Sequence, residues 1–124
     1  MHVGLFAAIP ALLFIGSAAA DPTVLAESGG FLLGNAYRCG VPTERVERAG
    51  QVIHDFVVAA ARDSSELAAA NSRFAEIFLA TASATQDPGA FPSCAVVVQQ
   101  FDRLERHHQR VGMERKAQAA IQGF

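Results

Sequence analysis

The sequence has no tryptophan, one tyrosine, two cysteines and a single lysine, Lys116. Two cysteines are too few for a cysteine-dense mini-scaffold. Charged residues make up only 18% of the 124 residues and the formal net charge is −2, so no excess of positive charge attracts the chain to nucleic acid. Hydrophobic residues reach 51%, which excludes a disordered or collagenous chain. These numbers predict one small globular domain.

Charged side chains are also missing from residues 1–20, which contain no Asp, Glu, Lys or Arg. The apolar run from Leu5 to Ile15 has the length of a signal-peptide core, roughly 7–15 residues. Small residues follow it, and Ala18 and Ala20 form a cleavage site that makes Asp21 the first mature residue. We therefore predict a signal peptide over 1–20, one domain over 21–124, and a periplasmic or secreted location.

Two alternatives to a cleaved signal peptide are a membrane anchor and a core helix. An anchor needs about 20 apolar residues. The stretch from Val3 to Ala20 is slightly shorter, and its second half consists mainly of Gly, Ser and Ala. We favour cleavage, which leaves no integral membrane span in the processed chain.

Cys39 and Cys94 both lie in the predicted mature part. An even number of cysteines in an exported chain predicts a disulfide. Their separation of 55 positions excludes a CxxC redox motif, a CxxCH haem site and a zinc knuckle. A bridge closing a loop of this length stabilises a fold by about 4 kcal/mol. The alternative, two buried thiols in a cytosolic protein, requires that the signal peptide is misassigned.

Turn and capping signals divide the mature chain into four helical stretches. Asp21 and Pro22 are suited to start the first, and Gly40 to end it. Three small residues four positions apart would let another backbone approach closely: Ala26, Gly30 and Gly34. We nevertheless favour a break at residues 28–30, with the helix starting near Phe31, because each glycine costs a helix interior about 1 kcal/mol.

The second and third helices show clear apolar stripes. After the extended link at Pro42, Thr43 and Glu44 open the second, whose apolar positions are Val46, Ala49, Ile53, Phe56 and Ala60. Asp63 followed three residues later by Glu66 is the pattern of a capping box for the third. Its stripe is Leu67, Ala70, Phe74, Ile77, Phe78 and Thr81.

The segment 85–93, TQDPGAFPS, is a loop by composition, and Ser93 is suited to cap a fourth helix. One face of that helix carries Val97, Phe101, Leu104, His108 and Val111. We expect Gly112 to interrupt it, leaving a weaker helix over 113–124. No convincing strand is present, so the sequence predicts an all-α, up-down bundle of about four helices. In such a bundle the first helix ends where the fourth begins, which brings Cys39 to Cys94.

No catalytic or cofactor site is predicted. The chain lacks GxSxG, HExxH, an EF-hand loop and a glycine-rich phosphate loop before Lys116. His107 and His108 point about 100° apart on a helix and neither has a histidine four residues away, so no metal site is expected. A metal or small-ligand carrier using these two or His54 is the alternative function. The basic residues of the last helix are interpreted as a solvated face, with pairs such as Asp102–Arg106.

The excess of apolar residues on the second predicted helix indicates a function more strongly than the histidines or the charged residues do. Val57 and Val58 lie beside the main stripe of the second helix, so that helix is apolar around more than half of its circumference. Such a helix is central in the bundle or covers a partner. We therefore predict a non-enzymatic protein-binding or chaperone-like module with Phe56, Val57, Val58 and Phe91 at its interface. Its partner is another protein or a second copy of the chain.

The segments FLLGNAYRCGV (31–41) and PTERVERAGQVI (42–53) give the chain a resemblance to small, exported, two-cysteine helical proteins of Proteobacteria. The plan of a signal peptide, about 100 helical residues and one long-range disulfide is also similar to that of the acid-stress periplasmic chaperones. The resemblance implies an exported helical fold, and the similarity of plan implies apolar surface that is unmasked at low pH.

Overall fold

A computed structural model describes residues 21–84 and 92–122 of the chain. Its elements are α2 (Pro22–Arg38), α3 (Thr43–Ala60), α4 (Ser64–Ala82) and α5 (Cys94–Gln122). Within these ranges every element is a helix, which confirms the all-α class with four helices. The predicted signal peptide with its cleavage residues Ala18 and Ala20, and the aromatic residues Phe91 and Phe124, lie outside the described residues.

Helix α2 is continuous, so the predicted break at residues 28–30 is wrong. Asp21 caps its start by accepting a hydrogen bond from the Thr23 amide at 2.8 Å, and proline occupies its first turn. The helix ends as expected before Gly40, whose φ of +91° is a left-handed conformation that glycine adopts without strain.

Close packing explains why α2 keeps its glycines. A Cβ atom at Gly29 would lie 2.5 Å from Ile53 Cγ2 of α3. At Gly30 it would lie 2.9 Å from the Phe74 carbonyl oxygen of α4, and at Gly34 2.7 Å from Thr81 Cβ. The two neighbouring helices therefore approach α2 more closely than any side chain permits, and this contact offsets the low helix propensity of glycine.

Capping defines the turn between α3 and α4. The Asp63 carboxylate accepts a hydrogen bond from the Glu66 amide at 2.8 Å, as the capping-box pattern predicts. Glu66 reaches back one residue further than in the usual box and accepts a hydrogen bond from the Arg62 amide at 2.9 Å. Side-chain carboxylates thus accept hydrogen bonds from backbone amides on both sides of Asp63.

Helix α5 passes through Gly112 without interruption, contrary to expectation. Ser93 caps its start through a hydrogen bond from the Val96 amide, at 3.3 Å. A single glycine costs about 1 kcal/mol, and the Met, Glu, Arg, Lys and Ala residues that follow it are strong helix formers. Their summed propensity keeps the helix continuous over 29 residues.

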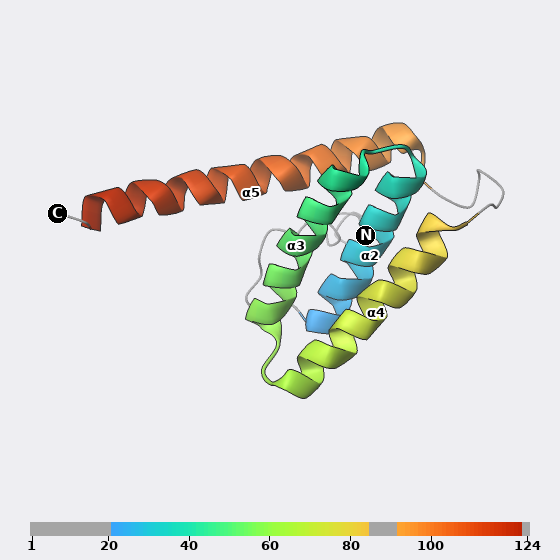
Figure 1. Cartoon of the computed structure of the whole chain (residues 1–124), viewed down its shortest axis with the longest axis horizontal. Coiled ribbons are helices and arrows are strands. Elements are labelled where there is room, and N and C mark those ends of the chain that lie inside the picture. Colours follow the sequence, from blue (N-terminus) through green and yellow to red (C-terminus); the bar gives the residue numbers. More distant parts are fainter. Residues whose placement is uncertain (1–20, 85–91, 123–124) are drawn as a thin grey trace, which may run out of the picture.

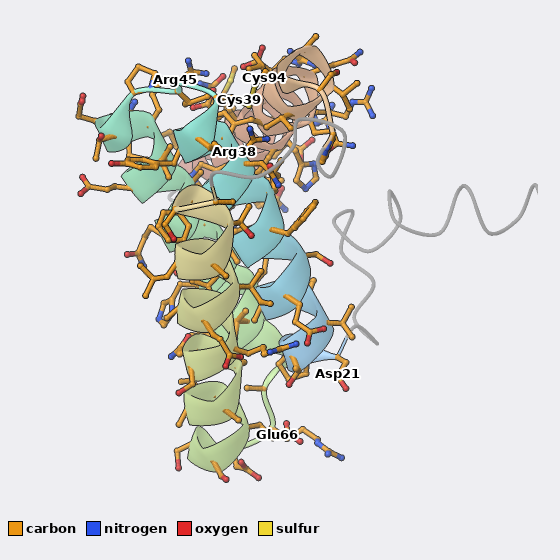
Figure 2. All side chains as sticks on the ribbon, turned by 90° about the vertical axis from the view of Figure 1, so that its right-hand side faces the viewer. Asp21, Arg38, Cys39, Arg45, Glu66 and Cys94 are labelled. Atoms are coloured by element: carbon orange, nitrogen blue, oxygen red, sulfur yellow. A yellow bond between two sulfur atoms is a disulfide. The ribbon has the colours of Figure 1, made fainter. Side chains whose placement is uncertain are left out.

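The helices are not all arranged alongside one another. Figure 1 shows α2 between α3 and α4, running up and down, while α5 lies across the end where α2 finishes and α3 starts. Cys39 and Cys94 join at that end, with their Cα atoms 5.5 Å apart, which confirms the predicted disulfide. Figure 2 shows them beside Arg45, far from Asp21 and Glu66. We call this the disulfide end.

The core lies where α2 meets the other helices. Its largest fully buried side chains are Phe101, Leu33, Ile53, Val57, Val97 and Asn35. Asn35 is held there by donating to the Phe31 carbonyl at 2.9 Å and accepting from Arg38 at 2.9 Å, as a buried amide requires. The first turns of α5 therefore belong to the same core as α2 and α3.

Candidate functional site

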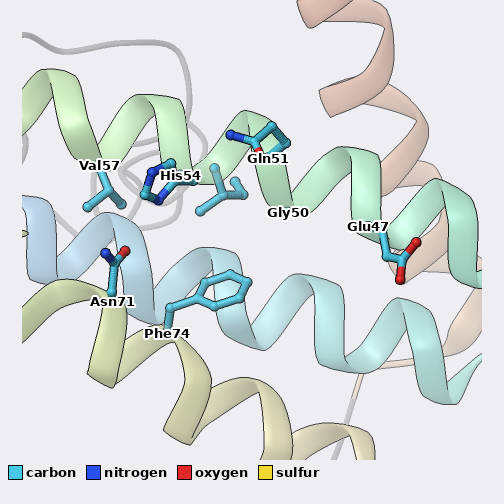
Figure 3. A pocket seen from close by; sticks show the side chains of 8 residues that line it. Glu47, Gly50, Gln51, His54, Val57, Asn71 and Phe74 are labelled. Carbon is cyan, nitrogen blue, oxygen red and sulfur yellow. The ribbon is translucent and has the colours of Figure 1, made fainter. Parts of the chain in front are cut away.

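Two adjoining hollows of about 450 and 440 Å³ lie between α3 and α4. The first is lined by Glu47, Gly50, Gln51, Ile53, His54, Val57, Asn71 and Phe74. The second is lined by Tyr37, Thr43, Val46, Glu47, Phe78, Leu79, Ala82 and Ser83. Both include Glu47 and therefore adjoin each other, and together we call them the α3–α4 groove. Figure 3 shows the first hollow, with His54 and Val57 of α3 facing Asn71 and Phe74 of α4.

The glycines of α2 create this groove. Gly29 contacts α3 and Gly30 contacts α4, and successive residues of a helix point about 100° apart. The two neighbours therefore sit at nearly a right angle around α2 and touch each other little. Three helices placed in this way occupy three corners of a square. A four-helix bundle fills the fourth corner with a helix, but here α5 crosses the disulfide end, and no other helix of residues 21–84 and 92–122 fills that corner.

The second hollow of the groove is mainly apolar, whereas the first is also lined by the polar residues Glu47, Gln51, His54 and Asn71. Phe74 and Phe78 of α4 stack with ring centroids 6.0 Å apart, and Tyr37 lies 6.3 Å from Phe78. Leu79 is 63% exposed at the rim. Among the described residues that line the two hollows, Glu47 is the one carboxylate, and no Arg or Lys is present. The groove therefore suits an apolar segment that carries a positive charge.

The predicted interface around Phe56 does not form one surface. Val57 is only 2% exposed and belongs to the core, but it also lines the first hollow of the α3–α4 groove, so its place at an interface stays a prediction. Phe56 packs partly buried against the core, while Val58 is 45% exposed. Val57 follows Ile53 by four residues, and this spacing in the sequence already placed it on the inward stripe.

The histidines do not assemble into a metal site. His54 is exposed at the groove, and His107 Nδ1 lies 3.2 Å from Arg110 Nη2 on α5. His108, expected on the apolar face of α5, is exposed. Over residues 21–84 and 92–122, no three His, Cys, Asp or Glu side chains are placed to hold a metal ion. Nothing in these positions favours the carrier alternative.

Arg45 fixes the direction in which α5 leaves the disulfide end. Its Nη2 atom lies 3.1 Å from Asp102 Oδ1 and 2.6 Å from Glu105 Oε1. Its guanidinium also lies 5.3 Å from the ring centroid of the buried Phe101. The hydrogen bond to Glu105 raises the pKa of Arg45 above its usual value. Asp102, predicted to pair with Arg106 on its own helix, thus binds α3.

The far part of α5 is not packed against any other described part of the chain. Every residue from Met113 to Ile121 is exposed, and these two are 70% and 72% exposed. Figure 1 shows this part extending beyond α3 into solvent. We call residues 113–122 the C-terminal arm. No helix among the described residues is both long and apolar enough to cross a membrane.

Comparisons with known proteins return no match to any family model, curated protein or solved structure. The resemblance to small exported two-cysteine proteins therefore stays a prediction. Function has to be argued from the α3–α4 groove and the C-terminal arm.

We expect the turn between α3 and α4 to weaken in acid. Hydrogen bonds from Arg62 hold the pKa of Glu66 below its ordinary value of 4.5. The folded state thus binds this proton more weakly than the unfolded state, so the stabilisation is complete above pH 4.5 and is lost as the pH falls through the folded-state pKa. In urea titrations, Glu66→Gln should be less stable than wild type at pH 7 and nearly equal to it at pH 3. An equal difference in unfolding free energy between wild type and variant at both pH values would contradict this role of Glu66.

Proposed function

We propose that the protein is an exported, non-enzymatic helical module that acts by binding another polypeptide in the α3–α4 groove. The observation that carries this proposal is the fourth corner beside α2, which no described helix fills and where the aromatic and aliphatic side chains of the second hollow adjoin a single carboxylate, Glu47. An amphipathic helix laid into a groove between two helices is a common mode of peptide recognition. The occupant completes the four-helix arrangement and buries Leu79 and Tyr37.

A helical occupant fits the groove better than a small molecule does. Small-molecule sites enclose most of the ligand surface and place several polar groups around it. The α3–α4 groove instead lies open along two helices, with polar side chains around its first hollow and mainly aromatic and aliphatic ones around its second. A helix with an apolar stripe and a neighbouring Arg or Lys satisfies both the surface and Glu47.

Export is supported by the disulfide, because such bonds persist outside the reducing cytosol. We place the mature protein in the periplasm or outside the cell. Intact-mass spectrometry of protein from its source cell should give a chain that starts at Asp21 and is two hydrogens lighter than the reduced form. A chain that keeps residues 1–20 and has two alkylatable thiols would refute the export proposal.

Photo-crosslinking tests the groove directly. A photoreactive amino acid in place of Leu79 should give discrete protein adducts in the source cell, because this side chain sits at the rim of the groove. The matched control is the same amino acid at Val24, an exposed apolar position on α2 that does not line the groove. Adducts from position 79, but not 24, support the proposal. No adduct from position 79, or equal adducts from both, overturns it.

A further inference from the structure

Among the described residues, no element packs against the C-terminal arm and no helix fills the α3–α4 groove. We propose that the arm of a second copy of this chain occupies the groove, so that two chains exchange arms. This inference rests on the proposed function of the groove and names its partner.

Exposure of the arm indicates that it has a binding partner. All nine residues from Met113 to Ile121 lie at the surface, on a stretch that makes no contact with the core. In proteins, tertiary packing of an amphipathic face supplies most of the stability of a helix, and the arm has no such packing within the described residues. Packing in a groove supplies it.

The apolar stripe of the arm points away from its own body. On α5 the inward stripe is Val97, Phe101 and Leu104, and helical spacing continues it through Val111 to the polar residues Arg115 and Gln118. Met113 follows Leu104 by nine residues, which at about 100° per residue places it on the opposite side of the helix. Ala117, Ala120 and Ile121 extend the stripe that begins at Met113. It is a separate surface, directed at another molecule.

Charge on the two parts is complementary. Residues 107–124 contain three basic and one acidic residue, whereas residues 21–106 contain seven basic and eleven acidic ones. Arg110 and Lys116 lie three residues before and after Met113, and therefore about 60° to either side of it. They flank the apolar stripe and match Glu47, the carboxylate in the groove. Such complementarity fixes register and speeds association.

The direction of α5 makes the exchange intermolecular. The helix is continuous through Gly112, and Figure 1 shows it running past α3 and away from α4, the two helices that line the groove. It can reach that groove only by breaking at Gly112. Exchange between two copies needs no break, and twofold symmetry forms the contact twice.

The experiment uses the mature, disulfide-bonded chain at increasing concentration in sedimentation velocity. We expect a dimer whose dissociation constant rises on the order of tenfold or more in Met113→Glu/Ile121→Glu, as for central interface residues. Arg115→Glu is the matched control: it introduces the same side chain about 160° from Met113, changes the net charge by the same two units as the double variant and should leave the constant unchanged. Glu47→Lys should weaken the dimer and Lys116→Glu should partly restore it. A monomer at all concentrations, or equal effects of the control, overturns the proposal.

Crosslinking in a mixture of ¹⁴N- and ¹⁵N-labelled chains identifies the occupant. With the photoreactive residue at position 79, adducts to residues 113–122 that combine the two labels support exchange. Adducts within one chain only would show that the arm folds back, and would overturn the second copy as occupant. Adducts only to other proteins in the cell would also overturn the second copy as occupant, but they would leave the proposed function of the groove intact. Binding of the arm to phosphatidylglycerol vesicles, with no dimer in solution, would replace the second copy by a lipid surface.

Discussion

The variant Cys39→Ser/Cys94→Ser will lose about 2–5 kcal/mol of unfolding free energy, as small exported domains do when a native disulfide is removed. The bridge closes a loop with a sequence separation of 55, and it is the covalent link that holds the first residue of α5 against the end of α2. Without it the unfolded chain gains conformational entropy. Urea titrations followed by circular dichroism will measure the loss.

Wild-type protein treated with a reductant is the matched control for this variant. Its unfolding curve should superimpose on that of the double serine variant, because both lack the same bond. The Phe101 and Leu104 side chains are buried independently of the sulfur atoms, so part of the α5 packing should persist after reduction. A variant within about 0.5 kcal/mol of the oxidised wild type, which is the range of ordinary surface substitutions, would contradict the expected role of the bridge.

Gly34→Ala will destabilise the fold by about 1–3 kcal/mol, although alanine is the better helix former. The new Cβ atom would lie 2.7 Å from Thr81 Cβ and 3.0 Å from the Phe78 carbonyl oxygen. Because one of these neighbours is backbone, the clash is relieved only by moving α4 away from α2. Gly34→Leu enlarges the clash and should cost more. Thermal and urea unfolding will measure both.

Gly112→Ala is the matched control, since it makes the same substitution in another helix. Nothing lies within 4 Å of a Cβ atom at this position. The change should therefore stabilise the protein by about 0.5–1 kcal/mol, through helix propensity alone. If Gly34→Ala were also stabilising, the close approach of α2 and α4 would be wrong, and with it the geometry that opens the groove.

The two glycine-rich regions explain why sequence patterns predicted some helix boundaries and missed others. Local propensity predicts a break at residues 28–30 and an interruption at Gly112, and both predictions fail. At the first site, contacts from α3 and α4 outweigh the cost of glycine. At Gly112, the strong helix formers that follow in the sequence outweigh the cost of glycine without any contact from another helix. The spacing of Ala26, Gly30 and Gly34 already contained the correct alternative for α2.

Other features depended on contacts between distant residues. Alternation of caps and stripes predicted the four helices, and cysteine placement predicted which helix ends meet. The placement of the cysteines could not predict the direction of α5, because a disulfide fixes only one end of a helix. That direction depends on Arg45 with Asp102 and Glu105, which are 57 and 60 positions away in the chain. The groove follows from this direction, and therefore no local pattern marked it.

Because α5 is attached along its first turns only, a small tilt there has a large effect at its tip. The last buried residue of α5 before Ile121 is Leu104, and the next residue, Glu105, pairs with Arg45. From Leu104 to Ile121 the helix rises by about 26 Å at 1.5 Å per residue. A tilt of about 10° at Leu104 would therefore displace Ile121 by about 4 Å, so the reach of the molecule depends on side chains far from its tip.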